Sequence, residues 1–174
     1  MSDMTVETSR LLLRRMAASD AAELYQATGD HEVMRYWNSG GDQDIEQAKQ
    51  RIDRINNHWE EHGFGDWGVV EKESGRLIGF SGLHYVADIS EVNIGYAFEK
   101  SKWRQGLGFE TGQAILDFGF RELGLSEVVA IIMPDNIASI KLAEKFGMTF
   151  WKQFMWGGAP HVAYSMSHED WNKF

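Results

Sequence analysis

A glycine-containing loop stands directly before a helical pattern in the segment "KSKWRQGLGFETGQAILDFGF", residues 100–120. Glycine lets a backbone turn tightly and approach a ligand, and the first N–H groups of a helix have no partner within the helix. Together with the positive end of the helix dipole, such N–H groups form a site for phosphate or pyrophosphate. Gly106 and Gly108 therefore predict an anion site, although a glycine-rich helix entry without a ligand has the same pattern.

Two common nucleotide-binding motifs do not fit this loop. A P-loop requires Lys followed by Ser or Thr after its last glycine, and no such pair follows Gly106 or Gly108. A Rossmann fingerprint requires a third glycine in the first strand–helix turn of a parallel unit, and "GLGFET" has none. The loop is therefore neither a P-loop nor a Rossmann fingerprint, and a helix entry without a ligand stays an alternative.

Histidine and cysteine spacing indicates no metal site. The chain has no cysteine, which excludes disulfides and thiolate chemistry. No histidine pair forms the H-E-x-x-H motif of a zinc site, because no Glu directly follows a histidine that has a second histidine four residues on. His84 ends a strand-like run, where it either faces a substrate pocket or has a structural role. The other histidines are His31, His58, His62, His161 and His168.

The first part of the chain predicts one strand and two or three helices. A short apolar run bounded by charge predicts a strand over residues 10–16. Ser19 is a good N-cap for a helix over residues 19–27, and a second short helix is expected over 30–37. Apolar residues at helical spacing predict an amphipathic helix over 44–62, which Gly63 ends.

The rest of the chain predicts a sheet with two further helices. Three runs rich in Val, Ile, Tyr and Phe, over residues 64–72, 76–86 and 90–99, predict an antiparallel meander. After the loop and its helix, the continuous apolar run 125–134 predicts a buried strand. Asn136 then opens a helix that Gly147 closes, and a final hairpin is expected over residues 148–167. The layout is α/β or α+β, with helices on both faces of the sheet, in one domain over residues 1–174.

Composition narrows the classes of partner. The net charge of −9 speaks against non-specific binding to nucleic acid and favours a cationic partner such as an amine, although it also serves solubility alone. No run is long and apolar enough for a membrane span or signal peptide, so we expect a cytoplasmic protein. Candidate pocket walls, each of which could equally be core, are Trp37, Trp67, Tyr85 and Trp151.

Five segments in this order resemble the GNAT superfamily of acyl-CoA-dependent N-acyltransferases, and in particular its ribosomal-protein alanine N-acetyltransferase-like (RimJ/RimL-like) branch. They cover nearly the whole chain: "ETSRLLLRRMAASDAAELY", "DHEVMRYW", "GVVEKESGRLIGFSGL", "NIGYAFEKSKWRQGLGFET" and "NIASIKLAEKFGM". The resemblance implies a GNAT fold, with a mixed but mostly antiparallel sheet of about seven strands. In that fold the strands at residues 90–99 and 125–134 splay apart. It also implies that acetyl-CoA is the co-substrate, that a primary amine is the acceptor, and that a homodimer is possible.

The resemblance further implies which residues bind CoA. The family loop pattern, Arg/Gln-x-x-Gly-x-Gly/Ala, reads Trp103 to Gly108 here, with Trp in place of Arg or Gln. Backbone N–H groups would hold the pyrophosphate, and Arg104 would add a charge-assisted contact or remain a solvated surface residue. The pantetheine arm would lie beside the strand at residues 96–98 and contact Asn136. The implied cofactor-binding residues are Tyr96, Ala97, Phe98, Trp103, Arg104, Gln105, Gly106, Leu107, Gly108, Phe109, Asn136 and Ser139.

The catalytic groups implied by the resemblance are Ser139, Glu91 and Asn93. Many relatives have a base, Glu, where Asn93 stands, and Asn cannot take a proton at neutral pH. Glu91, on the same strand face, could act through water or be an ordinary exposed acid, and bulk water could also deprotonate the amine. Ser139 matches a serine that lies near the CoA sulfur in the ribosomal-protein enzymes, and it is also the third residue of a capped helix. Tyrosine has this role in other branches, and no tyrosine stands at that position here.

The sequence thus favours an N-acetyltransferase that moves an acetyl group from acetyl-CoA to a protein N-terminus or a small amine by direct attack. One alternative is an acyl-CoA-binding protein of GNAT fold with little catalysis, because of Asn93. Another is a binder of a different phosphate ligand on the same loop.

Overall fold

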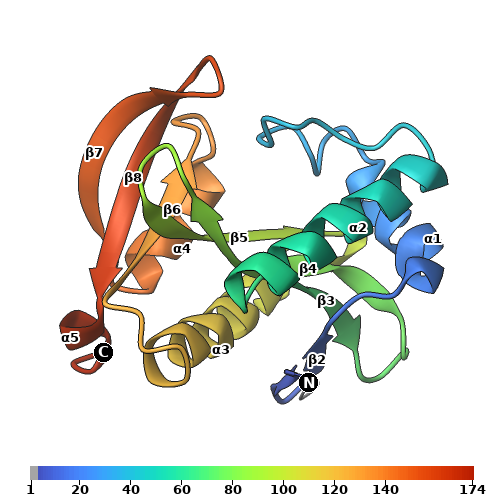
Figure 1. The fold of residues 1–174 in the computed structure, drawn as a ribbon, viewed down its shortest axis with the longest axis horizontal. Helices are drawn as coiled ribbons and strands as arrows, with labels where there is room; N and C mark the ends of the chain where they lie inside the picture. The colour runs from blue at the N-terminus through green and yellow to red at the C-terminus, as the bar shows by residue number, and fades with distance from the viewer. Residues whose placement is uncertain (1–3) are drawn as a thin grey trace.

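The computed structural model describes residues 4–174 and contains one open, eight-stranded sheet with flanking helices (Figure 1). The strand order is β1-β2-β3-β4-β5-β6-β8-β7, and every neighbouring pair is antiparallel except β5 and β6. The strands are β1 (Val6–Glu7), β2 (Leu11–Arg14), β3 (Asp66–Glu71), β4 (Leu77–Val86), β5 (Glu91–Phe98), β6 (Glu127–Ile132), β7 (Thr149–Trp156) and β8 (Ala159–Ser167). The helices are α1 (Ala21–Thr28), α2 (Ile45–His62), α3 (Leu107–Arg121), α4 (Ile137–Lys145) and α5 (His168–Trp171).

The predicted class and most elements are confirmed, including the meander, the long amphipathic helix and the final hairpin. The sheet has one strand more than about seven because β1 adds a two-residue strand at the edge, which is too short to leave an alternating pattern. Gly63 ends α2 in the left-handed region, with φ of 76°, as expected of a helix-terminating glycine.

Two predictions near the N-terminus are wrong. Ser19 does not cap α1, since a short 3-10 turn over Ala18–Asp20 precedes that helix. Asp20 is the N-cap residue of α1, but its carboxylate accepts a hydrogen bond from the Ala17 N–H at 2.8 Å, at the start of the 3-10 turn, and pairs with Arg14.

Residues 31–36 form turns and no helix. The Asp30 side chain accepts hydrogen bonds from the backbone N–H groups of Glu32 and Val33, as at a helix start, but the chain turns again at Trp37. Helices this short are marginal on their own, and here the chain buries Val33 and Met34 in turns without extending the helical turn.

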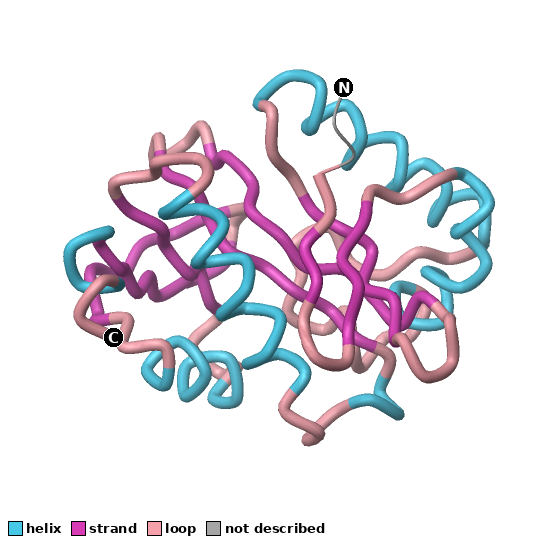
Figure 2. The backbone as a smooth tube through the Cα atoms, turned by 90° about the horizontal axis from the view of Figure 1, so that it is seen from below, coloured by secondary structure: helices cyan, strands magenta, loops and turns pink. Residues whose placement is uncertain are grey.

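Strands β5 and β6 diverge, as predicted. They pair at a single register position, Asn93 with Val129, whereas β4 and β5 pair along their whole length. Figure 2 shows the strands in two groups that separate on either side of this junction. The half of β5 from Ile94 to Phe98 therefore has one edge without a neighbouring strand.

Both faces of the meander are covered. Phe80 of β4 packs on Trp37, with ring centroids 5.1 Å apart, while Leu83 lies under Gly119 of α3. Since successive strand residues point to opposite faces, α3 and the segment after α1 lie on opposite sides of β4. The core is mainly apolar, with Trp67, Phe80, Phe120 and Leu83 among the largest buried side chains.

Candidate active site

Two cavities meet at the gap between β5 and β6. The first, here called the inner cavity, has a volume of about 340 Å³ and lies among residues 36–39, β5, β6 and the β7–β8 hairpin. The second, the loop cavity, has a volume of about 620 Å³ and extends to the glycine loop. The residues that line both cavities are Tyr36, Trp37, Tyr96, Asn136, Ser139 and Leu142.

The glycine loop bends through two left-handed residues, Arg104 with φ of 60° and Gly106 with φ of 77°. Arginine rarely adopts this conformation, so the rest of the loop must hold it there. None of the six backbone N–H groups from Arg104 to Phe109 donates to an acceptor within the described residues. The last three belong to the first turn of α3, and all six residues except Gln105 border the loop cavity, so the loop has free donors at the positive end of a helix.

The turn between β1 and β2 holds this loop in place. The Glu110 carboxylate accepts hydrogen bonds from Thr8, Ser9 and Arg10, at 2.6–3.1 Å. Burial alone would raise the pKa of Glu110, but these donors outweigh it and lower the pKa to about 2. Arg10 also donates to the Gln105 carbonyl at 3.0 Å, which ties the glycine loop to the same turn.

Most of the predicted cofactor-binding residues of the loop line the loop cavity. Arg104, Gly106, Leu107, Gly108 and Phe109 line the loop cavity, together with Trp103 and the backbone region of Ala97 and Phe98. Trp103 Nε1 donates to the Phe98 carbonyl at 3.0 Å and so ties the loop to the end of β5. Gln105 does not line the cavity, because its side chain donates back to the Ser101 carbonyl.

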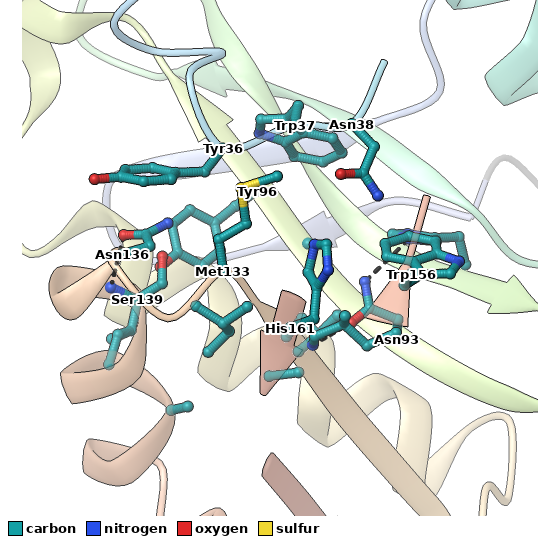
Figure 3. Close-up of a pocket in the computed structure, with 18 of the residues that line it drawn as sticks. Tyr36, Trp37, Asn38, Asn93, Tyr96, Met133, Asn136, Ser139, Trp156 and His161 are labelled. Carbon is teal, nitrogen blue, oxygen red and sulfur yellow. Dashed lines mark hydrogen bonds between the residues drawn. The ribbon is translucent and has the colours of Figure 1, made fainter. Parts of the chain in front are cut away.

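Tyr96 and Ser139 meet where the two cavities join. The two hydroxyls are 2.8 Å apart, within hydrogen-bond distance (Figure 3). Asn136 caps α4 as predicted, with its side-chain oxygen accepting from the Ser139 N–H at 3.2 Å. Burial raises the pKa of Tyr96 despite the Ser139 contact, so the phenol keeps its proton. The sequence marked no tyrosine at the position used by other branches, whereas β5 brings the Tyr96 hydroxyl to Ser139.

Asn93 connects the diverging strands by its side chain. Its Oδ1 accepts from the Ile131 N–H at 2.7 Å, so its Nδ2 is the group that donates to His84 Nε2 at 3.0 Å. His84 Nε2 is therefore without a proton, and Nδ1 is buried without a partner among the described residues. Burial lowers the pKa of His84 to about 4 and keeps the ring neutral.

Glu91 lines neither cavity, although it lies on the same strand face as Asn93. It stands at the first position of β5, opposite Val86. Burial and the neighbouring Glu127 raise the pKa of Glu91. Of the two β5 residues expected near the chemistry, only Asn93 borders the inner cavity.

Of the four aromatic residues predicted as pocket walls, only Trp37 is one. Trp67 is fully buried in the core, and Tyr85 and Trp151 are exposed, each by 38%. The sequence singled out neither Trp156 nor His161, which the β7–β8 hairpin brings into the inner cavity (Figure 3). Both residues are distant in sequence from the rest of the site, so no local sequence pattern identifies them as site residues.

No helix within residues 4–174 is long and apolar enough to cross a membrane. Over the same residues, no three His, Cys, Asp or Glu side chains are arranged to hold a metal ion.

A family model and a curated relative both identify this chain as similar to acetyltransferases. The model of the acetyltransferase (GNAT) domain family matches residues 10–149. The "Uncharacterized N-acetyltransferase YoaA" of Bacillus subtilis (strain 168) is 33% identical over 143 residues, which are 82% of this chain and 81% of that protein.

Solved structures agree on the fold. A GNAT-family acetyltransferase from Bacillus anthracis superposes with a TM-score of 0.83 at 24% identity, covering 95% of this chain and 99% of that one. The ribosomal-protein-S5-alanine acetyltransferase from Vibrio fischeri has a TM-score of 0.77 at 19% identity, covering 97% and 99%. The protein therefore belongs to the GNAT family and is an N-acetyltransferase.

Proposed function

We propose that this enzyme takes its acetyl group from acetyl-CoA and binds the CoA pyrophosphate at the glycine loop. The observation that carries the proposal is the run of six unpaired N–H groups from Arg104 to Phe109 at the start of α3. Such donors are arranged before any ligand arrives, so a doubly charged pyrophosphate gains hydrogen bonds without reorganising the loop. The Arg104 side chain is exposed beside the loop cavity and would add a charge-assisted contact.

The pantetheine arm would lie along the free edge of β5, beside Tyr96, Ala97 and Phe98. Within the described residues, that half of the strand has no ladder partner on the β6 side, so backbone groups on this edge are available to an extended ligand, apart from the Phe98 carbonyl that Trp103 binds. The thioester would then reach the junction of the two cavities, where Tyr96, Asn136 and Ser139 lie.

Acetyl-CoA supplies a thioester whose carbonyl carbon is open to attack by an amine. The hydroxyl pair of Tyr96 and Ser139 would donate a proton to the leaving sulfur, because the pair lies at the cavity junction and the Tyr96 phenol keeps its proton. Asn93 has both ends of its amide engaged and cannot act as a base, so its role is to hold the strands at the gap.

The acceptor would enter the inner cavity as a primary amine, either a protein N-terminus or a small amine. The fold shared with an S5-alanine acetyltransferase supports a place in the RimJ/RimL-like branch and a protein N-terminus as one acceptor class. The cytoplasmic location and the homodimer stay predictions.

The test mixes purified protein and acetyl-CoA with peptides that begin with alanine or serine, free amino acids, polyamines and arylalkylamines, and measures release of free thiol. Thiol release that depends on one of these amines is the expected result. Tight CoA binding measured by calorimetry, without thiol release for any amine, would instead support the CoA-binding alternative. Absence of CoA binding would overturn the proposal.

A further inference from the structure

An amine reaches a protein at neutral pH mostly as ammonium and must lose a proton before it can attack. The titratable side chains that line the inner cavity are Tyr36, His84, Tyr96 and His161. No carboxylate, lysine or arginine among the described residues lines it. The side chains of this cavity that could take the proton directly are therefore two phenols and two imidazoles.

His84 and the phenols are unsuited to this task. His84 Nε2 already accepts a hydrogen bond from Asn93, and the ring stays neutral because burial lowers its pKa to about 4. A neutral phenol is a poor proton acceptor near pH 7. Tyr36 donates its hydroxyl to the Asp135 carbonyl at 3.3 Å, and Tyr96 is joined to Ser139.

His161 has the opposite arrangement. Its Nδ1 lies 3.0 Å from the Ala159 carbonyl, and a carbonyl only accepts, so Nδ1 carries the proton. Nε2 then has a lone pair, and it makes no hydrogen bond with any residue over 4–174. The side chain is only 2% exposed and projects into the inner cavity between Tyr96 and Asn93 (Figure 3).

The hairpin keeps this ring in position. The Trp156 ring meets the imidazole edge to face, with centroids 5.4 Å apart, and Trp156 Nε1 donates to Asp88. At the hairpin turn, Gly157 lies against the Asn38 side chain, so residues 36–39 and the hairpin border the same cavity. A ring fixed in this way has its free nitrogen ready for a substrate.

We propose that His161 is the catalytic base that takes the proton from the acceptor amine, an inference that rests on the proposed function. His161 Nε2 removes one proton from the ammonium group and becomes an imidazolium. The amine nitrogen bonds to the thioester carbon, the carbon–sulfur bond breaks, and the sulfur takes a proton from the Tyr96–Ser139 pair. The second proton of the amine nitrogen is transferred to the Tyr96–Ser139 pair and replaces the proton given to the sulfur. His161 then releases its own proton to solvent.

The test compares His161→Gln and His161→Ala with wild type, using the amine that wild type acetylates best. We expect kcat to fall about 100-fold, the usual share of a general base, while CoA affinity stays within about twofold. The acidic limb of the kcat/KM profile should disappear in His161→Gln, and added imidazole should restore activity to His161→Ala. His31→Gln, which removes an exposed histidine, is the matched control.

The outcomes separate this inference from the proposed function. Wild-type enzyme that binds CoA but acetylates no amine contradicts the proposed function and the base with it. Active wild type with unchanged kcat in both His161 variants contradicts only the base. The base is also contradicted if the His161 variants are slower but keep the acidic limb of the kcat/KM profile and are not rescued by imidazole. That result is expected of a histidine with a purely structural role.

Discussion

The Tyr96 and Ser139 hydroxyls lie 2.8 Å apart at the junction of the two cavities, although 43 positions separate them in the chain. Neither residue belongs to the glycine loop, so the pair connects the α4 start to the middle of β5. Two hydroxyls in contact can pass a proton between them, and this makes their contributions to catalysis interdependent.

Replacement of Ser139 by Ala should lower kcat about tenfold or more while changing CoA affinity little, because the lost group acts on the leaving sulfur. Tyr96→Phe should have a similar effect, and the double variant should be little slower than either single one. Steady-state kinetics and calorimetric CoA titration measure both quantities. Ser126→Ala, at an exposed serine, serves as the control. Unchanged kcat in Ser139→Ala would remove this residue from the mechanism.

Arg104→Gln should weaken CoA binding about fivefold, which corresponds to about 1 kcal/mol for an exposed charged contact. The KM for S-acetylpantetheine, which has no pyrophosphate, should not change. Arg54→Gln removes an exposed arginine from α2 and should affect neither ligand. If binding of both thioesters fell equally, Arg104 would not be contacting the phosphates.

Glu110→Gln should destabilise the protein by about 1–3 kcal/mol at pH 7, the range for hydrogen bonds to a charged group. The folded-state pKa of Glu110 is about 2, below its ordinary value of 4.5, so the carboxylate's stabilisation is complete above pH 4.5. It is lost as pH falls from there toward 2. Urea unfolding should therefore show the full difference between wild type and variant at pH 7 and a clearly reduced one near pH 3. A difference that does not depend on pH would contradict the ionic role.

The Asp66→Asn variant should become increasingly stable relative to wild type as pH rises. Burial raises the pKa of Asp66 from 3.8 to about 7, and Oδ1 has no partner among the residues described. The unfolded carboxyl ionises first, so wild type loses stability between about pH 4 and pH 7. The variant carries no such charge, and its advantage should grow by about 2 kcal/mol or more across this window. Thermal unfolding at pH 5 and pH 8 measures the change, with the exposed Asp53→Asn as control.

Local features of the site could be predicted from the sequence. Gly106 and the helical pattern after it specify a turn with free N–H groups, because backbone geometry and helix-end hydrogen bonding depend on a few adjacent residues. The Asn136 cap and its contact with the Ser139 N–H are local for the same reason. The order of strands and helices followed from apolar periodicity, and resemblance to a family added the divergence of β5 and β6.

Only the tertiary structure decided which side chains meet around the gap. Glu91 and Asn93 look equivalent on the strand, yet only Asn93 reaches the inner cavity. Since β8 lies between β6 and β7 in the sheet, it brings His161 close to the strand that carries Asn93. These contacts depend on the strand order and on the contact of the β7–β8 turn with residues 36–39. Burial of the whole core determines both, so no short stretch of sequence specifies which side chains meet.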